Sequence, residues 1–330
     1  MQAFVLVPGT WTGPWIWKKV AEGLRGRGHS VHLVTLSGLD RPGADVSHVG
    51  LDTHVEDVHA VVRDLAPERV VLVSHSTSGV VAGAVADREP CRVDRTVYVE
   101  AQLPHDGRSA IDAFDEPLRG DELRLIDENG GRWPAPDVDV VSDAQGLTYE
   151  EARWLTGRLR DHPGRPLTEP VRLARPLAEQ RATYVVCELE HFDGRLAADV
   201  ERMRSAPTWR FRTLDTGLWP MVSDPDALVA LLDEVAAEVA AEDRAGRTPQ
   251  ITAGDQARIT GRDARGGRGA HGAGGRETRR DTGRGTGGDI GRGSGGDIDR
   301  FSPGDAAGNG RSRPAWDTPG DEVGPQRGRG

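Results

Sequence analysis

One serine lies in a sequence context that is typical of a catalytic nucleophile. The apolar residues 70–73 predict a short buried strand, small and polar residues follow at once, and an apolar pattern resumes at Val80. This order predicts a strand, a sharp turn and a helix, with Ser76 at the tip of the turn. A serine there exposes its hydroxyl above the sheet, and the backbone N–H of the next residue, Thr77, faces the same point.

The window departs from the nucleophile-elbow pattern G-x-S-x-G because serine replaces both glycines, at Ser74 and Ser78. Both positions stay small, as the elbow requires, since neighbouring backbone passes close to them. Gly79 supplies one glycine directly afterwards. The alternative interpretation is a buried strand followed by a serine or threonine that caps a helix, where these residues are strongly favoured.

Strands and helices alternate over the first hundred residues. The expected strands cover residues 3–7, 31–35, 70–73 and 95–100, and the expected helices cover residues 15–28, 51–65 and 80–88. Such alternation predicts an α/β fold with a doubly wound, mostly parallel sheet. Because ligands bind beyond the carboxyl ends of the strands in these sheets, we expect Thr10, Ser76 and Glu100 at one edge. This shared location favours the elbow interpretation.

The regular pattern lapses from residue 102 to about residue 180, where eight prolines separate short helical pieces such as residues 149–158. We interpret this segment as an inserted helical cap over the site, because long connections without a function are uncommon in compact domains. The sheet resumes at residues 183–187 and 209–214, and a closing helix covers residues 224 to about 241. The expected folded domain therefore spans residues 1–244.

The remaining residues, 245–330, are rich in Gly, Arg and Asp, and we expect a disordered tail because they offer little apolar surface to bury. A Gly-Gly-Asp-Ile segment at residues 287–290 recurs at 295–298, but its spacing and number do not fit calcium-binding nonapeptide repeats. The tail holds 15 Arg against 11 Asp and Glu, so residues 1–244 carry about −14 of the net charge of −10. An acidic domain argues against nucleic acid as a specific ligand.

The sequence indicates a soluble cytoplasmic protein. No apolar run approaches the ~18 residues of a membrane helix, and the chain enters an apolar strand at residue 3 without a basic region or cleavage signal. Its two cysteines, Cys91 and Cys187, do not suggest a disulfide framework. No His or Cys cluster has metal-ligand spacing, so we expect neither a metal nor a cofactor. The oligomeric state is not indicated.

Six segments in this order carry a family resemblance. They are Phe4-Val-Leu-Val-Pro-Gly-Thr-Trp11, Gly28-His29, Leu51-Asp-Thr-His-Val55, the elbow, Tyr98-Val-Glu-Ala-Gln-Leu-Pro104 and Gly217-Leu-Trp-Pro-Met221. Together they resemble the α/β-hydrolase superfamily, and within it the branch of small-molecule methylesterases and hydroxynitrile lyases, over residues 1 to about 242. The resemblance implies that Ser76 is the nucleophile and that the N–H groups of Thr10 and Thr77 form the oxyanion hole. Two such donors stabilise the charge of a tetrahedral intermediate.

The resemblance also implies a catalytic acid after the strand that ends at Cys187. Local alignment favours Glu190, with Glu188 as its competitor, and Glu100 at the end of another strand is a third candidate. A glutamate can orient an imidazole as an aspartate does. For each of these carboxylates, a solvated loop position is the alternative.

The position of the base departs from the family pattern. The resemblance implies Gly-His after the last strand, whereas this sequence has Gly217 followed by Leu218. Leucine cannot take the proton of a serine hydroxyl, so ordinary triad chemistry is expected to fail or to slow by several orders of magnitude. His105 and His191 are candidate replacements. His75 is expected to point away from the site, as it does in relatives.

Two classes of function follow. The protein is either an esterase-type hydrolase that acts on a small apolar ester, lactone or thioester through Ser76 and Glu190 with a relocated base, or it has lost acyl transfer. In the second case it binds a small molecule or catalyses elimination, cyclisation or isomerisation. Trp11 and Trp219 flank the site positions and suit an apolar or aromatic ligand, with core packing as the alternative. The presence of the nucleophile and of the oxyanion residues favours the hydrolase, whereas Leu218 at the position of the base favours the second class.

Overall fold

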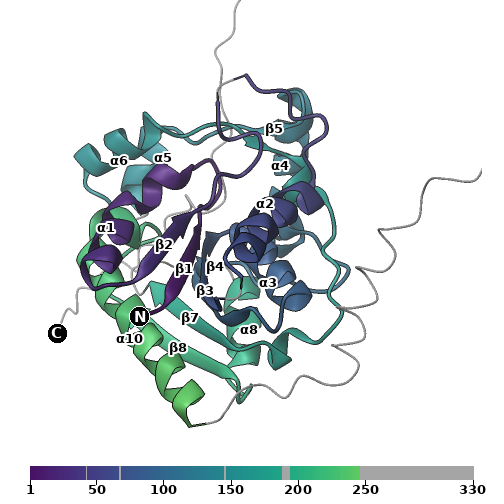
Figure 1. Ribbon diagram of the computed structural model, residues 1–330. Helices are drawn as coiled ribbons and strands as arrows, with labels where there is room; N and C mark the ends of the chain where they lie inside the picture. Colours follow the sequence, from purple (N-terminus) through teal and green to yellow (C-terminus); the bar gives the residue numbers. More distant parts are fainter. Residues whose placement is uncertain (42, 67, 145, 188–193, 246–330) are drawn as a thin grey trace, which may run out of the picture. The chain divides into compact units, whose positions relative to one another are not determined.

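The computed structural model describes residues 1–41, 43–66, 68–144, 146–187 and 194–245, with the backbone alone at 143–144 and 194–197. A six-stranded sheet forms the centre, in the order β2-β1-β3-β4-β7-β8 (Figure 1). Its strands are β1 (Ala3–Val7), β2 (Ser30–Leu33), β3 (Val70–Ser76), β4 (Val93–Ala101), β7 (Ala182–Cys187) and β8 (Trp209–Leu214). All five neighbouring pairs run parallel, which confirms the predicted α/β fold.

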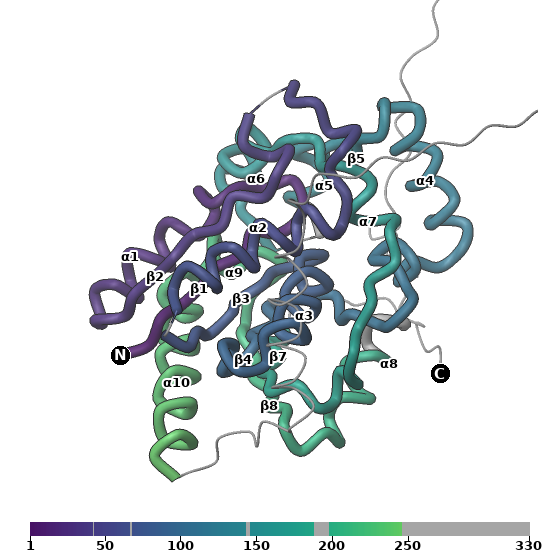
Figure 2. The backbone as a smooth tube through the Cα atoms, turned by 45° about the vertical axis from the view of Figure 1, so that its right-hand side comes forward, coloured from purple at the N-terminus to yellow at the C-terminus, as the bar shows by residue number. Residues whose placement is uncertain are grey.

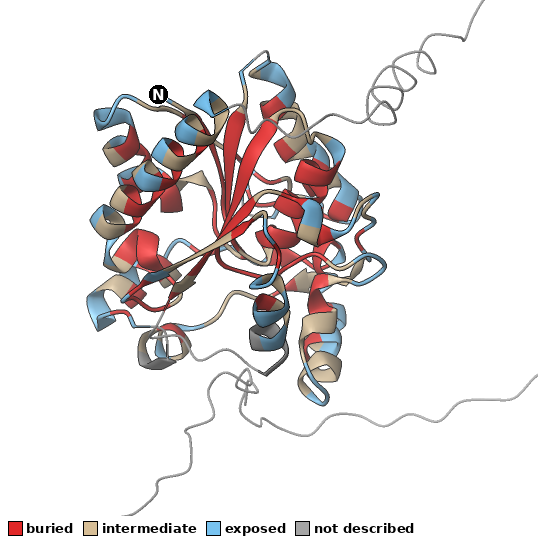
Figure 3. Cartoon of the chain, turned by 90° about the horizontal axis from the view of Figure 1, so that it is seen from below, coloured by how far each residue is buried: buried red, intermediate tan, exposed pale blue. Residues whose placement is uncertain are grey.

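Helices cover both faces of this sheet. On one face lie α1 (Lys18–Gly26), α9 (Pro220–Ser223) and α10 (Pro225–Arg244), and on the other lie α2 (Leu51–Asp64) and α3 (Ser78–Arg88). Successive side chains of β1 alternate between the faces: Phe4 and Leu6 join the first layer, and Val5 and Val7 join the second. Because both faces are covered, the central strands are buried throughout (Figure 3).

A third apolar cluster extends the second layer beside β7 and β8. The rings of Tyr98 and Trp209 stack with centroids 5.5 Å apart, and Val200 of α8 (Gly194–Met203) packs in the same cluster. Apolar clusters therefore lie on both faces of the sheet, while the edge strands β2 and β8 remain partly exposed.

The helix predicted over residues 15–28 differs at both ends from the helix in the structure. It begins as a 3-10 turn, η1 (Pro14–Trp17), and α1 ends at Gly26. Gly28 has a φ of 86°, and the N–H of His29 bonds the carbonyl of Leu24 at 3.1 Å. This left-handed glycine stops the helix and turns the chain into β2.

The segment between β4 and β7 folds into short elements. They are η2 (Ala110–Ala113), α4 (Leu118–Glu128), β5 (Arg132–Trp133), α5 (Val138–Ala144), α6 (Tyr149–Thr156), β6 (His162–Pro163), α7 (Arg165–Thr168) and η3 (Leu177–Glu179). The strands β5 and β6 pair antiparallel in a small separate sheet. Figures 1 and 2 both draw α4, β5, α5 and α6 at the upper end, away from the N-terminus and the end of α10.

The predicted disordered tail falls outside the described residues, which end at Ala245. Within the described ranges, no helix combines the length and apolar character needed to cross a membrane.

Candidate active site

Ser76 is the last residue of β3, and it adopts a left-handed backbone conformation with a φ of 55°. The helix α3 begins two residues later, at Ser78. A positive φ is uncommon outside glycine, and it persists only where surrounding structure holds the backbone in place. Here the carbonyl of Ser76 accepts a hydrogen bond from the N–H of Gln102 at 3.0 Å. This strand, strained residue and helix have the local geometry of a nucleophile elbow.

The serines in place of the elbow glycines fit because their hydroxyls are used. Ser78 Oγ donates to the carbonyl of His75 at 2.8 Å and accepts from the N–H of His75 at 3.2 Å. The next residue, Gly79, has no room for a side chain, because a Cβ there would overlap the carbonyl oxygen of Gln102. The need for glycine is therefore met one position after the second glycine of G-x-S-x-G.

The loop after β1 lies directly against the elbow. A Cβ on Gly9 would stand 2.5 Å from His75 Nδ1 and 3.2 Å from Ser76 Cβ, so only glycine fits there. The hydroxyls of Thr10 and Thr77 are hydrogen-bonded at 2.7 Å. Among the described residues no acceptor takes the backbone N–H of either threonine. The two predicted oxyanion donors thus belong to residues that are tied together through their side chains.

Trp11 anchors this loop to the segment between β4 and β7. Its φ is 62°, its N–H donates to His162 Nδ1 at 3.2 Å, and its carbonyl accepts from the N–H of Arg160 at 2.9 Å. Its indole N–H donates to the carbonyl of Trp133 at 3.1 Å, and the two indole rings lie 4.5 Å apart. Burial lowers the pKa of His162 well below its ordinary value, which keeps Nδ1 an acceptor. These contacts fix the conformation of the loop.

His75 points toward the loop after β8. Its Nε2–H donates to the carbonyl of Leu218 at 2.7 Å, and its ring lies 5.0 Å from that of Trp219. Complete burial lowers the pKa of His75 to about 4, so the ring is neutral near pH 7. Because His75 directly precedes Ser76, this bond brings residue 218 beside the elbow.

Leu218 and Trp219, two residues that the His75 ring contacts, differ in solvent exposure. Leu218 is half-buried and packs on the apolar layer of α1 and α10. Trp219 is only 2% exposed and belongs to that layer. The ring of Trp219 is therefore largely enclosed by protein, whereas Trp11 is half-buried.

The other described histidines near this edge have partners of their own. His105 Nε2 bonds Asp199 Oδ2 at 2.7 Å, and burial together with Arg202 and Arg108 lowers the pKa of His105. His54 is 1% exposed and donates to the backbone carbonyl of Ser37 at 3.0 Å. Within the described ranges, no hydrogen bond joins an imidazole to the Ser76 hydroxyl.

The carboxylate candidates are only partly placed. Glu100 is 2% exposed, has a φ of 43°, and accepts a hydrogen bond from the N–H of Cys187 at the end of β7. The other candidates, Glu190, Glu188 and the candidate base His191, lie outside the described residues. Among the residues that are described, no group of three or more His, Cys, Asp or Glu could hold a metal ion.

One residue of the site environment escaped the sequence analysis. His162 lies 151 residues from Trp11, in a two-residue strand, and no motif marks it. Trp133, whose carbonyl accepts the indole N–H of Trp11, lies in an equally short strand.

The family model described as "Alpha/beta hydrolase family" matches residues 4–231. Methyl jasmonate esterase 1 of Vitis vinifera is 33% identical over 252 residues, which cover 70% of this chain and 95% of that protein. A carbendazim hydrolyzing esterase of Nocardioides sp. (strain SG-4G) is 37% identical over 119 residues, which cover 36% of this chain and about half, 49%, of the relative. An extracellular alpha/beta-hydrolase structure from a Paenibacillus species aligns with a TM-score of 0.62 at 20% identity, covering 71% of this chain and 98% of the other.

Proposed function

The chain belongs to the alpha/beta hydrolase family, and we propose that it is an esterase-type serine hydrolase acting on a small apolar ester, lactone or thioester. Two relatives are named as esterases of small molecules, methyl jasmonate and carbendazim. The observation that carries the proposal is the left-handed Ser76 at the end of β3, beside the linked Thr10 and Thr77.

In the proposed reaction, the Ser76 hydroxyl gives its proton to the base while its oxygen attacks the carbonyl carbon of the ester. The carbonyl oxygen then carries a negative charge, to which the N–H groups of Thr10 and Thr77 donate. The base then returns the proton to the departing alcohol. Departure of the alcohol leaves an acyl group on Ser76, and water hydrolyses this intermediate. The anchoring of the loop through Trp11 supports the proposal, because donors fixed before reaction need no reorganisation as charge develops.

We further propose that Leu218 stands where the family has its catalytic histidine. The support is positional: residue 218 follows the last strand, and its carbonyl is bound by the residue that precedes the nucleophile. The hydrolase then works with an impaired base or with one relocated to His191 or His105. Glu190 is the proposed acid, and Glu100 is a buried alternative at the neighbouring strand end.

Leu218 also favours a second candidate function. An oxyanion hole without a proton-accepting histidine can still stabilise an enolate or bind a carbonyl ligand. In that case the protein binds a small molecule or catalyses an elimination, cyclisation or isomerisation.

The test is hydrolysis of short-chain aryl esters by the full-length protein, Ser76→Ala and Ser47→Ala, an exchange at an exposed serine on another loop. The proposal predicts turnover by the unaltered protein and Ser47→Ala, and loss to background in Ser76→Ala. Equal turnover by Ser76→Ala would remove the nucleophile from the mechanism. Absence of turnover by the unaltered protein across the panel would favour the second candidate.

A further inference from the structure

A cavity of about 290 Å³ opens at the amino ends of β4, β7 and β8. Its charged lining consists of Arg95, Arg175, Arg181, Arg210, Glu179 and Glu242, and we call it the arginine pocket. Arg95 lies six residues before Ala101, the residue that pairs with Ser76. At about 3.3 Å per residue the pocket is about 20 Å from the elbow along β4. It is therefore separate from the candidate active site.

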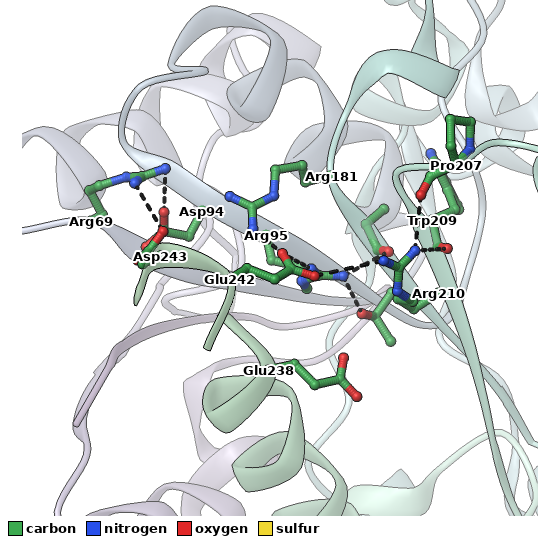
Figure 4. A network of polar contacts seen from close by, with 12 residues as sticks. Arg69, Asp94, Arg95, Arg181, Pro207, Trp209, Arg210, Glu238, Glu242 and Asp243 are labelled. Atoms are coloured by element: carbon green, nitrogen blue, oxygen red, sulfur yellow. Dashed lines mark hydrogen bonds and ion pairs between the residues drawn. The ribbon is translucent and has the colours of Figure 1, made fainter. Parts of the chain in front are cut away.

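One carboxylate in the pocket faces three guanidinium groups (Figure 4). Glu242 Oε2 accepts from Arg95 Nη2 at 2.8 Å and also from Arg181 Nη2, and Glu242 Oε1 lies 3.8 Å from Arg210 Nη2. Glu179, the other acid of the lining, is exposed to solvent. Positive charge is therefore in excess along this wall.

The nearby acids outside the lining are already committed. Asp94 and Asp243 both pair with Arg69, as Figure 4 shows, and the fourth arginine of the lining, Arg175, pairs with Asp87 at 3.3 Å. Glu238 pairs with Arg212, and Asp94 and Glu238 act on Arg181 and Arg95 only through space. Among the described residues, Glu242 is the carboxylate in direct contact with Arg95, Arg181 and Arg210.

Two of these cationic groups, those of Arg95 and Arg181, are also deeply buried. The Arg95 side chain is 1% exposed, and its Nε, like Arg181 Nη1 and Thr96 Oγ1, is buried without a hydrogen-bond partner among the described residues. Buried cations and donors are costly unless a partner compensates them. Burial, opposed by Glu242 and reinforced by Arg181, lowers the pKa of Arg95, yet an arginine stays protonated in proteins. A bound anion would supply the missing negative charge.

We propose that the arginine pocket binds a phosphate group. Planar guanidinium forks match the oxygens of phosphate and donate two bonds at once. Arg181 and Arg210, whose side chains are 13% and 39% exposed, would contact the anion from the open side, with Arg95 behind them. The phosphate is either inorganic phosphate or the phosphate group of a small monoester.

The test is calorimetric titration of the full-length protein with inorganic phosphate and, separately, with glycerol 3-phosphate, at constant ionic strength set by sodium chloride. We expect saturable binding of at least one of them, weakened at least tenfold in Arg181→Gln and in Arg210→Gln. The matched control is Arg212→Gln, on the same strand as Arg210, because Arg212 pairs with Glu238 and does not line the pocket. Its affinity is expected to stay within twofold of the unaltered protein.

The two ligands distinguish the source of the phosphate. Tighter binding of glycerol 3-phosphate identifies a monoester site, and tighter binding of inorganic phosphate identifies a free-anion site. Absence of saturable binding of both ligands would overturn the proposal, as would equal affinity in Arg210→Gln and the unaltered protein. Should Arg181→Gln fail to fold, Arg210→Gln decides, because Arg210 is partly exposed and its contact with Glu242 is long.

Discussion

The exchange Leu218→His tests the proposed position of the missing base. The hydrogen bond from His75 reaches the backbone carbonyl of residue 218, so it survives a change of side chain. Leu218 is half-buried against an apolar layer, and placing an imidazole there costs about 1–3 kcal/mol. Native domains are stable by about 5–15 kcal/mol, so we expect the variant to fold.

The expected gain in activity is large. A positioned general base contributes about 10²- to 10⁴-fold, which corresponds to about 3–5 kcal/mol of activation free energy. Histidine has an ordinary pKa of about 6.5, and partial burial at residue 218 disfavours its charged form, so we expect the new histidine to be mostly neutral at pH 7, as a base must be. Activity of the variant should then be lost only in acid.

The assay is the initial rate of hydrolysis of a short-chain aryl ester, with Leu218→Gln as the matched control because glutamine is polar and cannot act as a base. We expect kcat/KM of Leu218→His to exceed that of Leu218→Gln by at least a hundredfold. The gain should disappear when Ser76→Ala is added. Equal rates in the two folded Leu218 variants would refute the reasoning that residue 218 faces the nucleophile.

Three further outcomes are expected. Thr77→Val removes the hydroxyl bond that ties the oxyanion residues, and aryl-ester assays should show kcat reduced about 10- to 100-fold with little change in KM, whereas Thr77→Ser retains activity. Gly79→Ala places a Cβ on a backbone carbonyl, so thermal denaturation should show a loss of about 1–3 kcal/mol or more, far above that of an exposed substitution. Between pH 4 and 6.5, His75 binds a proton in the unfolded chain but stays neutral in the folded chain. The contribution of His75 to the free energy of unfolding therefore falls as the pH decreases, by up to about 3 kcal/mol. In denaturant titrations across this window, the free energy of unfolding of the unaltered protein minus that of His75→Asn should therefore fall with decreasing pH. Taking this difference cancels Asp94, whose pKa burial raises to about 6 and whose slope is opposite.

The strand β1 and the first four residues of β3 were predictable because burial on both faces makes each of them an uninterrupted apolar run. β1 and β8 agree with the expected residues 3–7 and 209–214. β3 was predicted too short, since pairing with β4 continues through the buried Ser74 and His75. A periodicity argument ends a strand where apolar residues end, whereas ladder hydrogen bonds do not require apolar side chains.

The elbow was predictable as a position but not in its details. Its order of apolar, small and apolar residues identifies the turn, but which position must be glycine depends on the backbone carbonyl of Gln102, directly after β4. The sequence pattern marks Ser74 and Ser78 as departures, whereas the structure accommodates Ser78 through two bonds to His75. Contacts with residues distant in the sequence decide at which position a Cβ atom has no room.

The anchoring of the oxyanion loop could not be predicted. Trp11 is held by His162 and Trp133, more than a hundred residues away, in strands of two residues each. Such short strands carry no periodicity, and their pairing is set by the packing around them.

The proposed mechanism requires Ser76 to be a nucleophile held at a preformed elbow. The most direct measurement is mass-spectrometric peptide mapping after incubation of the full-length protein and of Leu218→His with a fluorophosphonate, which bonds covalently to an activated serine. We predict a single adduct on the peptide that carries Ser76, formed faster in Leu218→His and absent from Ser76→Ala. Failure of both proteins to form the adduct at Ser76, or an adduct on another serine that accounts for ester hydrolysis, would contradict the claim.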